Sequence, residues 1–409
     1  MMHFKRILTL AIVSTYMLIL PASADEISIL RDQMQVMQAE MQAMRIEMAS
    51  LKGLEPSQLI KGPQVFRTKL PVQGIELGGE VEIEIVDTED DVATGEPEQH
   101  MQIDKVRLEL EVQINEDMRF EADIDFADGG VDLDEYYFIF QNLPLNSTLQ
   151  VGLDDRFFKG PRGTERYPLA ANAFWRDEEL GLLWEAEVND VYIAFSLSQG
   201  LELDTRDIGE DDSTGDAYAL IHDDSRGAAY NGFHEFSGGL GYEFDLGEAG
   251  QLEILAWGLI SKLSNADKAF LTTSLNNYSS TDDDQTRIGL NFEYSIGSLG
   301  LAGQFIDARD GDFDRYAWYL QPTFDFTLPV DWKYGTEQQL LFRYGQLMID
   351  NDATFNLPGT WDREEYTFAL ITQIAENMKL KTEYTIAEEE TGARDINNNE
   401  LMLQLEYQF

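Results

Sequence analysis

Five basic residues lie close together in a chain that is otherwise strongly acidic. They are Arg156, Lys159, Arg162, Arg166 and Arg176. Residues 156–176 contain a single acidic residue, Glu165, whereas the whole chain has 76 Asp and Glu against 29 Lys and Arg. Guanidinium groups bind phosphate and carboxylate through paired hydrogen bonds. The cluster is therefore a candidate anion-binding site; the alternative is a solvated loop whose bases pair with neighbouring acids.

The sequence lacks the motifs of common catalytic sites. It has no G-x-S-x-G nucleophile elbow, no H-E-x-x-H helix and no phosphate-binding loop. The acidic runs at 87–91, 204–212 and 282–284 carry the ligands that divalent cations prefer, but none has the spacing of an EF-hand loop. Beyond residue 24 the histidines are His100, His222 and His234. We predict no enzyme, no cofactor and no metal site, with an outer-membrane hydrolase as the remaining catalytic alternative.

The first residues have the pattern of a secretory signal peptide. Lys5 and Arg6 precede an apolar stretch at 7–20, and Ala22 and Ala24 complete an A-x-A cleavage site. The apolar stretch is shorter than the roughly 20 residues of a membrane-spanning helix. Cleavage after Ala24 changes the net charge from −47 to −49, because both lost charges are basic. A charge of this sign excludes a nucleic-acid-binding protein, and the absence of cysteine excludes disulfides.

Residues 25–53 carry a heptad repeat of apolar side chains. Positions a and d are occupied by Ile27, Leu30, Met34, Met37, Met41, Met44, Met48 and Leu51. Glu40 and Glu47 at position g would pair with Arg45 and Lys52 at position e of a neighbouring parallel chain. We expect a short α-helical coiled coil, with a single helix packed on its own chain as the alternative. The Met-rich core does not define the number of chains.

After residue 73 the period of the sequence changes from seven residues to two. In residues 117–127, for example, Phe120, Ala122, Ile124 and Phe126 alternate with charged residues. Sixteen such segments are expected: 74–86, 101–115, 117–127, 133–141, 147–154, 179–187, 189–198, 233–244, 250–261, 285–295, 298–307, 314–326, 337–348, 363–375, 377–388 and 399–409. Strands that are apolar on one face and charged on the other suit a boundary between lipid and water. We predict an all-β fold, a 16-stranded antiparallel transmembrane β-barrel.

The connections between these segments alternate in length through most of the chain. Short ones, such as Asn189-Asp190, belong on the periplasmic side of such barrels, and long ones outside. The coiled coil precedes an upward first strand and is therefore expected in the periplasm. Phe409 resembles the terminal aromatic residue that the barrel-assembly machinery reads. The expected organisation is a signal peptide (1–24), a coiled coil (25–53), a linker (54–73) and an outer-membrane barrel (74–409).

Several segments of residues 70–409 resemble the phosphate-selective porins O and P. They are DEYYFIF at 134–140, LQVG at 149–152, the residues Phe157, Phe158, Lys159 and Pro161, and LGLLWEAEVNDVYIAFSLSQG at 180–200. The resemblance implies a trimeric 16-stranded channel in the outer membrane, and family members commonly carry a coiled coil before the barrel. In general 16-stranded porins the third outer loop, here residues 154–178, folds into the barrel and forms the constriction.

The alternation also places basic residues on the inward faces of the later strands. They are Arg287, Arg315, Arg343, Arg363, Lys379 and Lys381. Because the first three strands put mainly Glu and Asp inward, the two walls would set up a field across the pore. The alternative is that a water-filled lumen simply tolerates charge.

These features together predict an outer-membrane porin for passive diffusion of small hydrophilic solutes and ions. We expect it to bind outer-membrane lipid and lipopolysaccharide, to form a homotrimer and to have an anion-binding constriction. A structural or adhesive barrel with a plugged lumen is the alternative.

Overall fold

The computed structural model describes residues 73–88, 98–126, 130–206, 220–225, 235–275, 282–329, 335–350, 362–389 and 399–409. The expected signal peptide, the coiled coil at 25–53 and nearly all of the linker lie outside the described residues. Within the described part of the chain, no helix is both long enough and apolar enough to cross a membrane.

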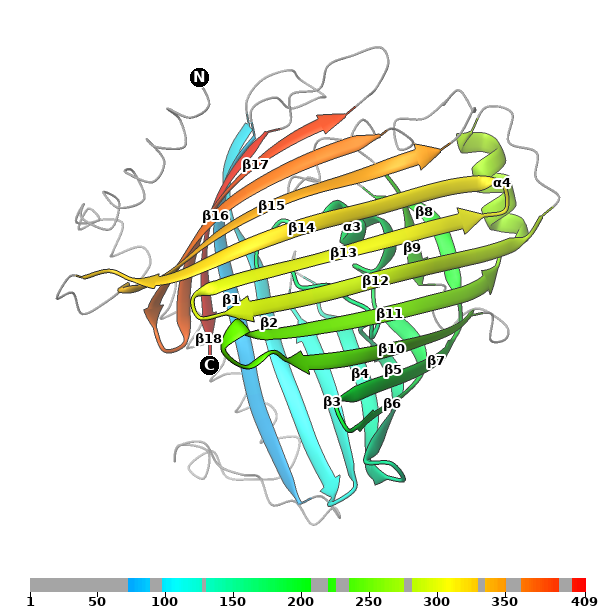
Figure 1. Ribbon diagram of the computed structural model, residues 1–409, viewed down its shortest axis with the longest axis horizontal. Helices are drawn as coiled ribbons and strands as arrows, with labels where there is room; N and C mark the ends of the chain where they lie inside the picture. Colours follow the sequence, from blue (N-terminus) through cyan, green and yellow to red (C-terminus); the bar gives the residue numbers. More distant parts are fainter. Residues whose placement is uncertain are drawn as a thin grey trace. The chain divides into compact units, whose positions relative to one another are not determined.

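Strands dominate the described residues, and sixteen of them form one closed antiparallel barrel (Figure 1). In chain order these are β1 (Gly74–Thr88), β2 (Glu98–Asn115), β3 (Met118–Asp125), β4 (Asp132–Leu143), β5 (Ser147–Asp154), β6 (Glu179–Val188), β7 (Val191–Ser198), β10 (Glu235–Asp245), β11 (Gln251–Lys262), β12 (Asp284–Ile296), β13 (Leu299–Asp310), β14 (Phe313–Thr327), β15 (Glu337–Asp350), β16 (Arg363–Ala375), β17 (Met378–Glu389) and β18 (Glu400–Gln408). The barrel predicted from the two-residue period is confirmed, and each strand lies within a few residues of its expected place.

The first and last strands close the barrel. Val81 of β1 faces Tyr407 of β18 in the register. Beyond the end of β18, the backbone N–H of Phe409 donates to the carbonyl oxygen of Gly79 at 3.0 Å, and the N–H of Gly79 donates to the carbonyl of Phe409 at 3.1 Å. Closure leaves no unpaired strand edge, which is the condition for placing a sheet in lipid.

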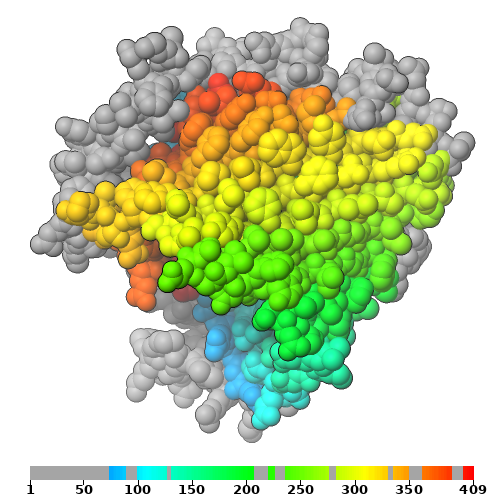
Figure 2. All heavy atoms as spheres, in the orientation of Figure 1, coloured from blue at the N-terminus to red at the C-terminus, as the bar shows by residue number. Residues whose placement is uncertain are grey.

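Alternation along each strand separates an apolar outer surface from a polar inner one. In β12, Ile288 is 64 % exposed while its neighbour Arg287 is 1 % exposed. Strands β10–β16 contribute to the surface seen in Figure 2. Large apolar residues of these strands, such as Leu240, Phe305 and Leu340, are exposed. Apolar exposure on this scale is rare in soluble monomers and typical of a lipid-facing wall.

The turn between β6 and β7 shows why these strands pair in the expected register. Asn189 and Asp190 both have positive φ, at 49° and 65°. A two-residue hairpin turn of this type twists in the same sense as its strands, and Asn and Asp adopt positive φ more readily than most residues. The short connection predicted at these two residues is present.

Two segments with secondary structure of their own lie in the long connections and pack inside the barrel. One is α3 (Leu169–Phe174), between β5 and β6; the other is the hairpin of β8 (Leu201–Arg206) and β9 (Leu220–Ser225), between β7 and β10 (Figure 1). These segments and the residues near α3 share one apolar core with inward side chains of the wall. Its members are Phe158, Leu169, Ala170, Ala171, Ala173, Phe174, Trp175, Leu201 and Leu220 from the long connections, and Trp257, Leu259, Ile306, Ala308, Ala317, Tyr319 and Leu347 from the barrel strands. Neither α3 nor the hairpin was predicted from the sequence.

A third segment, α4 (Asn265–Ser274), follows β11. Its N-terminus is a capping box, in which the hydroxyl of Ser264 accepts from the N–H of Asp267 at 3.1 Å and the Asp267 carboxylate accepts from the N–H of Ser264 at 2.6 Å. The same carboxylate accepts a hydrogen bond from the backbone N–H of Leu203 in β8 at 3.1 Å. Asp267, which caps α4, thus also binds the β8–β9 hairpin.

Replacement of Gly289 by Ala should loosen the apolar core. A Cβ at Gly289 would lie 2.1 Å from the indole of Trp257, and that indole stacks on Phe158 with the ring centroids 3.8 Å apart. Overpacking of this kind costs about 1–3 kcal/mol. We expect Gly289→Ala to lower the free energy of unfolding by that amount in urea titrations of the protein in lipid vesicles.

The matched control is Gly258→Ala in the adjacent strand β11. There the nearest atom to a new Cβ would be 3.6 Å away, an ordinary contact. An equal loss of stability in both variants would contradict the proposed role of the Trp257 contact.

Candidate functional site

Residues 155–178, named loop 3 here, run inside the barrel. The side-chain amides of Asn291 and Gln304 both donate to the carbonyl oxygen of Phe158 at 2.9 Å. The Trp175 indole N–H donates to the side-chain oxygen of Gln304 at 2.6 Å, and the Tyr319 hydroxyl donates to the carbonyl of Pro161 at 3.1 Å. The inward polar groups of β12, β13 and β14 therefore hold the loop within the lumen.

The middle of loop 3 is held by β15 and β17. The Arg343 guanidinium donates to the Thr164 hydroxyl and to the carbonyl of Arg166, both at 2.6 Å. The Glu383 carboxylate accepts from the backbone N–H groups of Glu165 at 2.6 Å and of Arg166 at 3.2 Å. Because its anchors run from β12 to β17, the loop follows much of the inner wall.

Two of the five predicted basic residues of loop 3 are buried in ion pairs. Arg156 lies 3.5 Å from Glu235 of β10. Arg166 lies 3.2 Å from Glu365 of β16 and 3.7 Å from Glu400 of β18. Both guanidinium groups are removed from water, so their part in the structure is to fasten the loop.

Lys159 is a partly buried member of the cluster. Its ammonium pairs with Asp155 four residues earlier, and burial lowers its pKa despite the nearby Glu178 and Glu135. Its charge is therefore opposed locally by carboxylates of the loop and of β4.

Arg162 and Arg176 are brought together at Tyr167. Their guanidinium carbons lie 4.0 Å and 4.5 Å from the centroid of the Tyr167 ring, the geometry of cation–π contacts. Arg162 also pairs with Glu165 at 2.8 Å, and its side chain is 26 % exposed. Among the described residues, no ion pair is found for Arg176. Together with Lys159, whose side chain is as exposed as that of Arg162, these two residues are the members of the predicted cluster that remain partly exposed.

A cavity of about 710 Å³ lies beneath the middle of loop 3. Its walls include Arg162, Gly163, Thr164, Ser298, Asp325, Thr327, Glu337, Lys379, Lys381 and Glu406. Ser298 lies in the two-residue connection between β12 and β13, and Thr327 ends β14 at the same end of the barrel, which places the cavity toward that end. Lys379 lies 2.7 Å from Glu406, and Lys381 lies 3.0 Å from Glu406 and 3.2 Å from Glu165. Both lysines line this cavity, and carboxylates balance their charges.

The inward arginines of the later strands face the lumen but not free water. Arg287, Arg315, Arg343 and Arg363 are all buried. Arg287 and Arg315 bind the same carboxylate, that of Asp223 in β9. Arg287 donates two hydrogen bonds of 2.7 Å to it, and Arg315 donates one of 2.8 Å. Asp310 of β13 completes the cluster at 2.8 Å and 2.9 Å.

The electrostatics of Asp223 follow from this placement. Burial alone would raise the pKa of its carboxyl group, but the guanidinium groups of Arg287 and Arg315 outweigh burial and lower the pKa to about 2. Asp223 therefore stays ionised at neutral pH and fixes the hairpin to the wall. Asp223, the partner of these arginines, was not predicted from the sequence.

The opposite part of the wall is acidic, as expected from the alternation. The register pairs Glu80 with Arg107, Arg107 with Asp125, and Glu111 with Glu121, so these residues share the inner face. Arg107 is surrounded by Asp123 at 3.3 Å, Asp125 at 2.8 Å and Asp134. Loop 3 thus lies in a lumen that has acidic strands along β1–β3.

Comparison with known proteins bears on the fold. No protein-family model matches the chain, and no curated protein sequence matches it. The outer membrane channel DcaP of Acinetobacter baumannii has a similar structure, with a TM-score of 0.59 and 12 % identity over 84 % of this chain and 99 % of that one. An anion-selective porin from Comamonas acidovorans has a TM-score of 0.54 and 11 % sequence identity, over 82 % of this chain and 99 % of that one. OprB of Pseudomonas putida has a TM-score of 0.56 and 9 % sequence identity, over 82 % of this chain and 94 % of that one.

Replacement of Asp223 by Asn should release the β8–β9 hairpin. The change leaves two buried guanidinium groups with one carboxylate fewer, and breaking a buried ion cluster in this way costs about 3–5 kcal/mol. We expect faster proteolysis of the hairpin while the barrel strands remain protected. Asp312→Asn is the control, because Asp312 is exposed and its pair with Arg309 spans 3.9 Å. Unchanged cleavage of Asp223→Asn would contradict the anchoring role.

Asp223 also makes the attachment of the β8–β9 hairpin to the barrel wall depend on pH. Because the pKa of Asp223 is lower in the folded protein than its ordinary value of 3.8, its stabilisation is complete above that value and is lost as the pH falls through about 2. The hairpin of the wild-type protein should therefore stay protected at pH 4 and open near pH 2. In Asp223→Asn this transition should be absent.

Proposed function

We propose that the protein is an outer-membrane porin, a water-filled channel for passive diffusion of small hydrophilic solutes and ions. The observation that carries the proposal is a closed 16-stranded barrel with an apolar outer surface and a charged loop held across its lumen. The similarity in fold to a protein described as an outer membrane channel and to one described as an anion-selective porin supports it.

The path for solutes is inferred from what fills the lumen. Loop 3 and the β8–β9 hairpin share an apolar core with β11, β13, β14 and β15, so water is excluded on that side. We infer that solutes pass between the water-facing edge of loop 3 and the acidic inner faces of β1–β3. On this path Arg162 and Arg176 face carboxylates across the lumen.

This arrangement gives the proposed channel two opposed preferences. The acidic excess concentrates cations at the mouth, an effect that weakens as salt shortens the screening length. At the narrowest point Arg162 and Arg176 attract anions, and confinement strengthens these nearer charges because water screens them less. We propose weak net selectivity at low salt and a binding site for phosphate-like or carboxylate anions on loop 3.

One observation favours a second candidate, a structural barrel with a plugged lumen. The inserted segments form an apolar core and two buried ion clusters inside the barrel, which is more than a constriction alone needs. A plugged barrel would leave planar lipid bilayers electrically silent, whereas a porin would conduct.

The wild-type protein should therefore insert into planar bilayers and conduct ions. In Arg162→Gln combined with Arg176→Gln, the reversal potential in a salt gradient should move toward that of a cation-selective channel. Block of the chloride current by phosphate should weaken as well, because the guanidinium groups that hold the anion are gone. Both quantities are read from the same current recordings.

Arg309→Gln is the control for a loss of positive charge away from loop 3, because it removes one such charge from an exposed residue next to the β13–β14 connection. Silent bilayers would favour the plugged barrel over the porin. Conduction with an unchanged reversal potential in the double variant would keep the channel and exclude loop 3 as its selectivity element.

We further propose that the channel is a homotrimer in the bacterial outer membrane, with residues 25–53 forming a periplasmic coiled coil. This rests on the heptad repeat and on the family resemblance of the barrel sequence. Deletion of residues 25–52 should weaken the oligomer band of unboiled protein on a gel and leave barrel folding intact. Light scattering that gave a monomer in mild detergent for the full protein would contradict the trimer.

A further inference from the structure

Strand β9 has charged or polar side chains with neighbours on both of its faces. Because side chains alternate along a strand, Asp223 points to the barrel wall while His222 and Asp224 lie on the other face. That face also carries Asp204, which is paired with His222 in the register of the hairpin. The ion cluster at Asp223 accounts for one face only, so the second face needs an explanation of its own.

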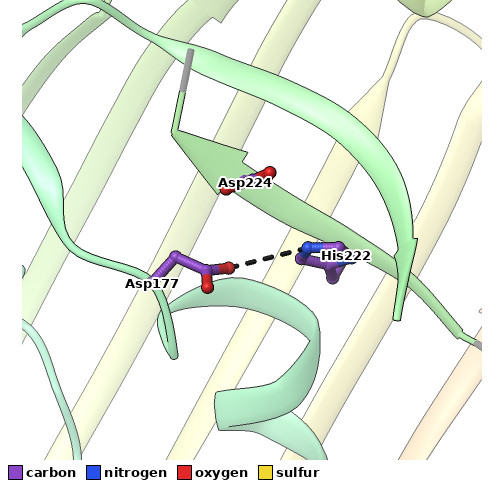
Figure 3. A group of neighbouring side chains, drawn as sticks. All are labelled: Asp177, His222 and Asp224. Carbon is purple, nitrogen blue, oxygen red and sulfur yellow. Dashed lines mark ion pairs between the residues drawn. The ribbon is translucent and has the colours of Figure 1, made fainter. Parts of the chain in front are cut away.

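The last residues of loop 3 bring a carboxylate to this second face. Figure 3 shows Asp177, from the end of loop 3, pointing toward His222, with Asp224 beside it on the same strand. One potential ligand atom from each of the three residues lies within 4.8 Å of the other two. The closest pair, Asp177 Oδ2 and His222 Nε2, is 3.6 Å apart.

This separation is too long for a hydrogen bond and close to that of two ligands on one metal ion. Ligands at 2.0–2.1 Å from a tetrahedral zinc ion lie about 3.3 Å from each other. A small inward movement of the side chains would therefore complete a three-ligand site with one position open.

The hydrogen bonding of the group points to a missing partner. The side chain of His222 is 6 % exposed, and Oδ2 of Asp177, the oxygen that faces Nε2 of His222, has no hydrogen-bond partner among the described residues. Nδ1 of His222, on the other side of the ring, also has none there. Buried polar atoms without partners are uncommon, and they often mark a water molecule or an ion. Arg206 binds the other oxygen of Asp177, so Oδ2 remains available to a ligand.

The types of ligand also suit a metal ion. One imidazole with two carboxylates is a ligand set suited to divalent transition metals. By contrast, the exposed run Asp282–Asp284 contains carboxylates alone and has no comparable buried group.

We propose that Asp177, His222 and Asp224 form a binding site for a divalent transition-metal ion of the zinc class. The ion would join the end of loop 3 to the β8–β9 hairpin, which the Asp223 cluster fixes to the wall on its other face. The site is a property of the inserted segments and does not depend on whether the barrel conducts.

The test uses the full-length protein in detergent, stripped with a chelator and titrated with zinc by equilibrium dialysis. We expect one tightly held ion per chain and a higher thermal midpoint in its presence. Cobalt in place of zinc should give a visible absorption spectrum that reports the imidazole ligand. His222→Ala should weaken zinc binding by roughly tenfold or more and remove the thermal shift.

His100→Ala is the control, since His100 lies in β2 and belongs to no group of potential ligands among the described residues. Circular dichroism and the heat-dependent gel mobility of each variant check that the barrel has folded. If His222→Ala fails to fold, Asp224→Asn, which keeps the size of the side chain, takes its place. A wild-type protein without saturable zinc binding, or a folded variant that binds zinc as tightly as wild type, would overturn the proposal.

Discussion

A buried guanidinium group requires a counter-charge, and this requirement organises the interior of the barrel. The barrel itself is held by its closed hydrogen-bond ladder, but the segments inside it are held where a carboxylate and an arginine meet. Asp223 meets Arg287 and Arg315, while Arg166 meets Glu365 and Glu400. Removing two charges from water costs several kcal/mol for each ion, so neither partner is stable in place without the other. Each inserted segment brings the charge that its part of the wall lacks.

This pairing divides the lumen into two parts with different chemistry. On the side of β11–β15 the loop and the hairpin share an apolar core, where aromatic stacking such as that of Phe158 on Trp257 excludes water. Toward β1–β3 the inner faces carry carboxylates, with Arg107 held among three of them. Within loop 3, Arg156 and Arg166 are buried in ion pairs, whereas Arg162 and Arg176 remain partly exposed.

The barrel strands could be predicted from the sequence far better than the segments that lie inside the barrel. Strands such as β12 can be recognised in the sequence by their two-residue period, since neighbouring residues such as Arg287 and Ile288 point in opposite directions. The hairpin β8–β9 and helix α3 have no such signal, because their stability comes from contacts with the wall rather than from their own pattern. The sequence also does not distinguish the buried Arg156 and Arg166 from the partly exposed Arg162. The partners of the buried pair, Glu235 and Glu365, lie far away in the sequence. A signal for His222 was present in the spacing His222-x-Asp224, but only the fold brings Asp177 to it.

The two-sided use of β9 has a consequence for how this segment can change over generations. A strand whose neighbouring residues serve opposite faces does not tolerate a shift by one position. A single inserted residue ahead of His222 would turn its imidazole toward Arg287 and Arg315 and would point Asp223 at Asp177. Substitutions within the hairpin affect one face at a time, whereas an insertion or deletion of odd length disrupts both at once. Sequence drift in this part of the chain should therefore proceed by replacement, with length variation confined to the connections on either side.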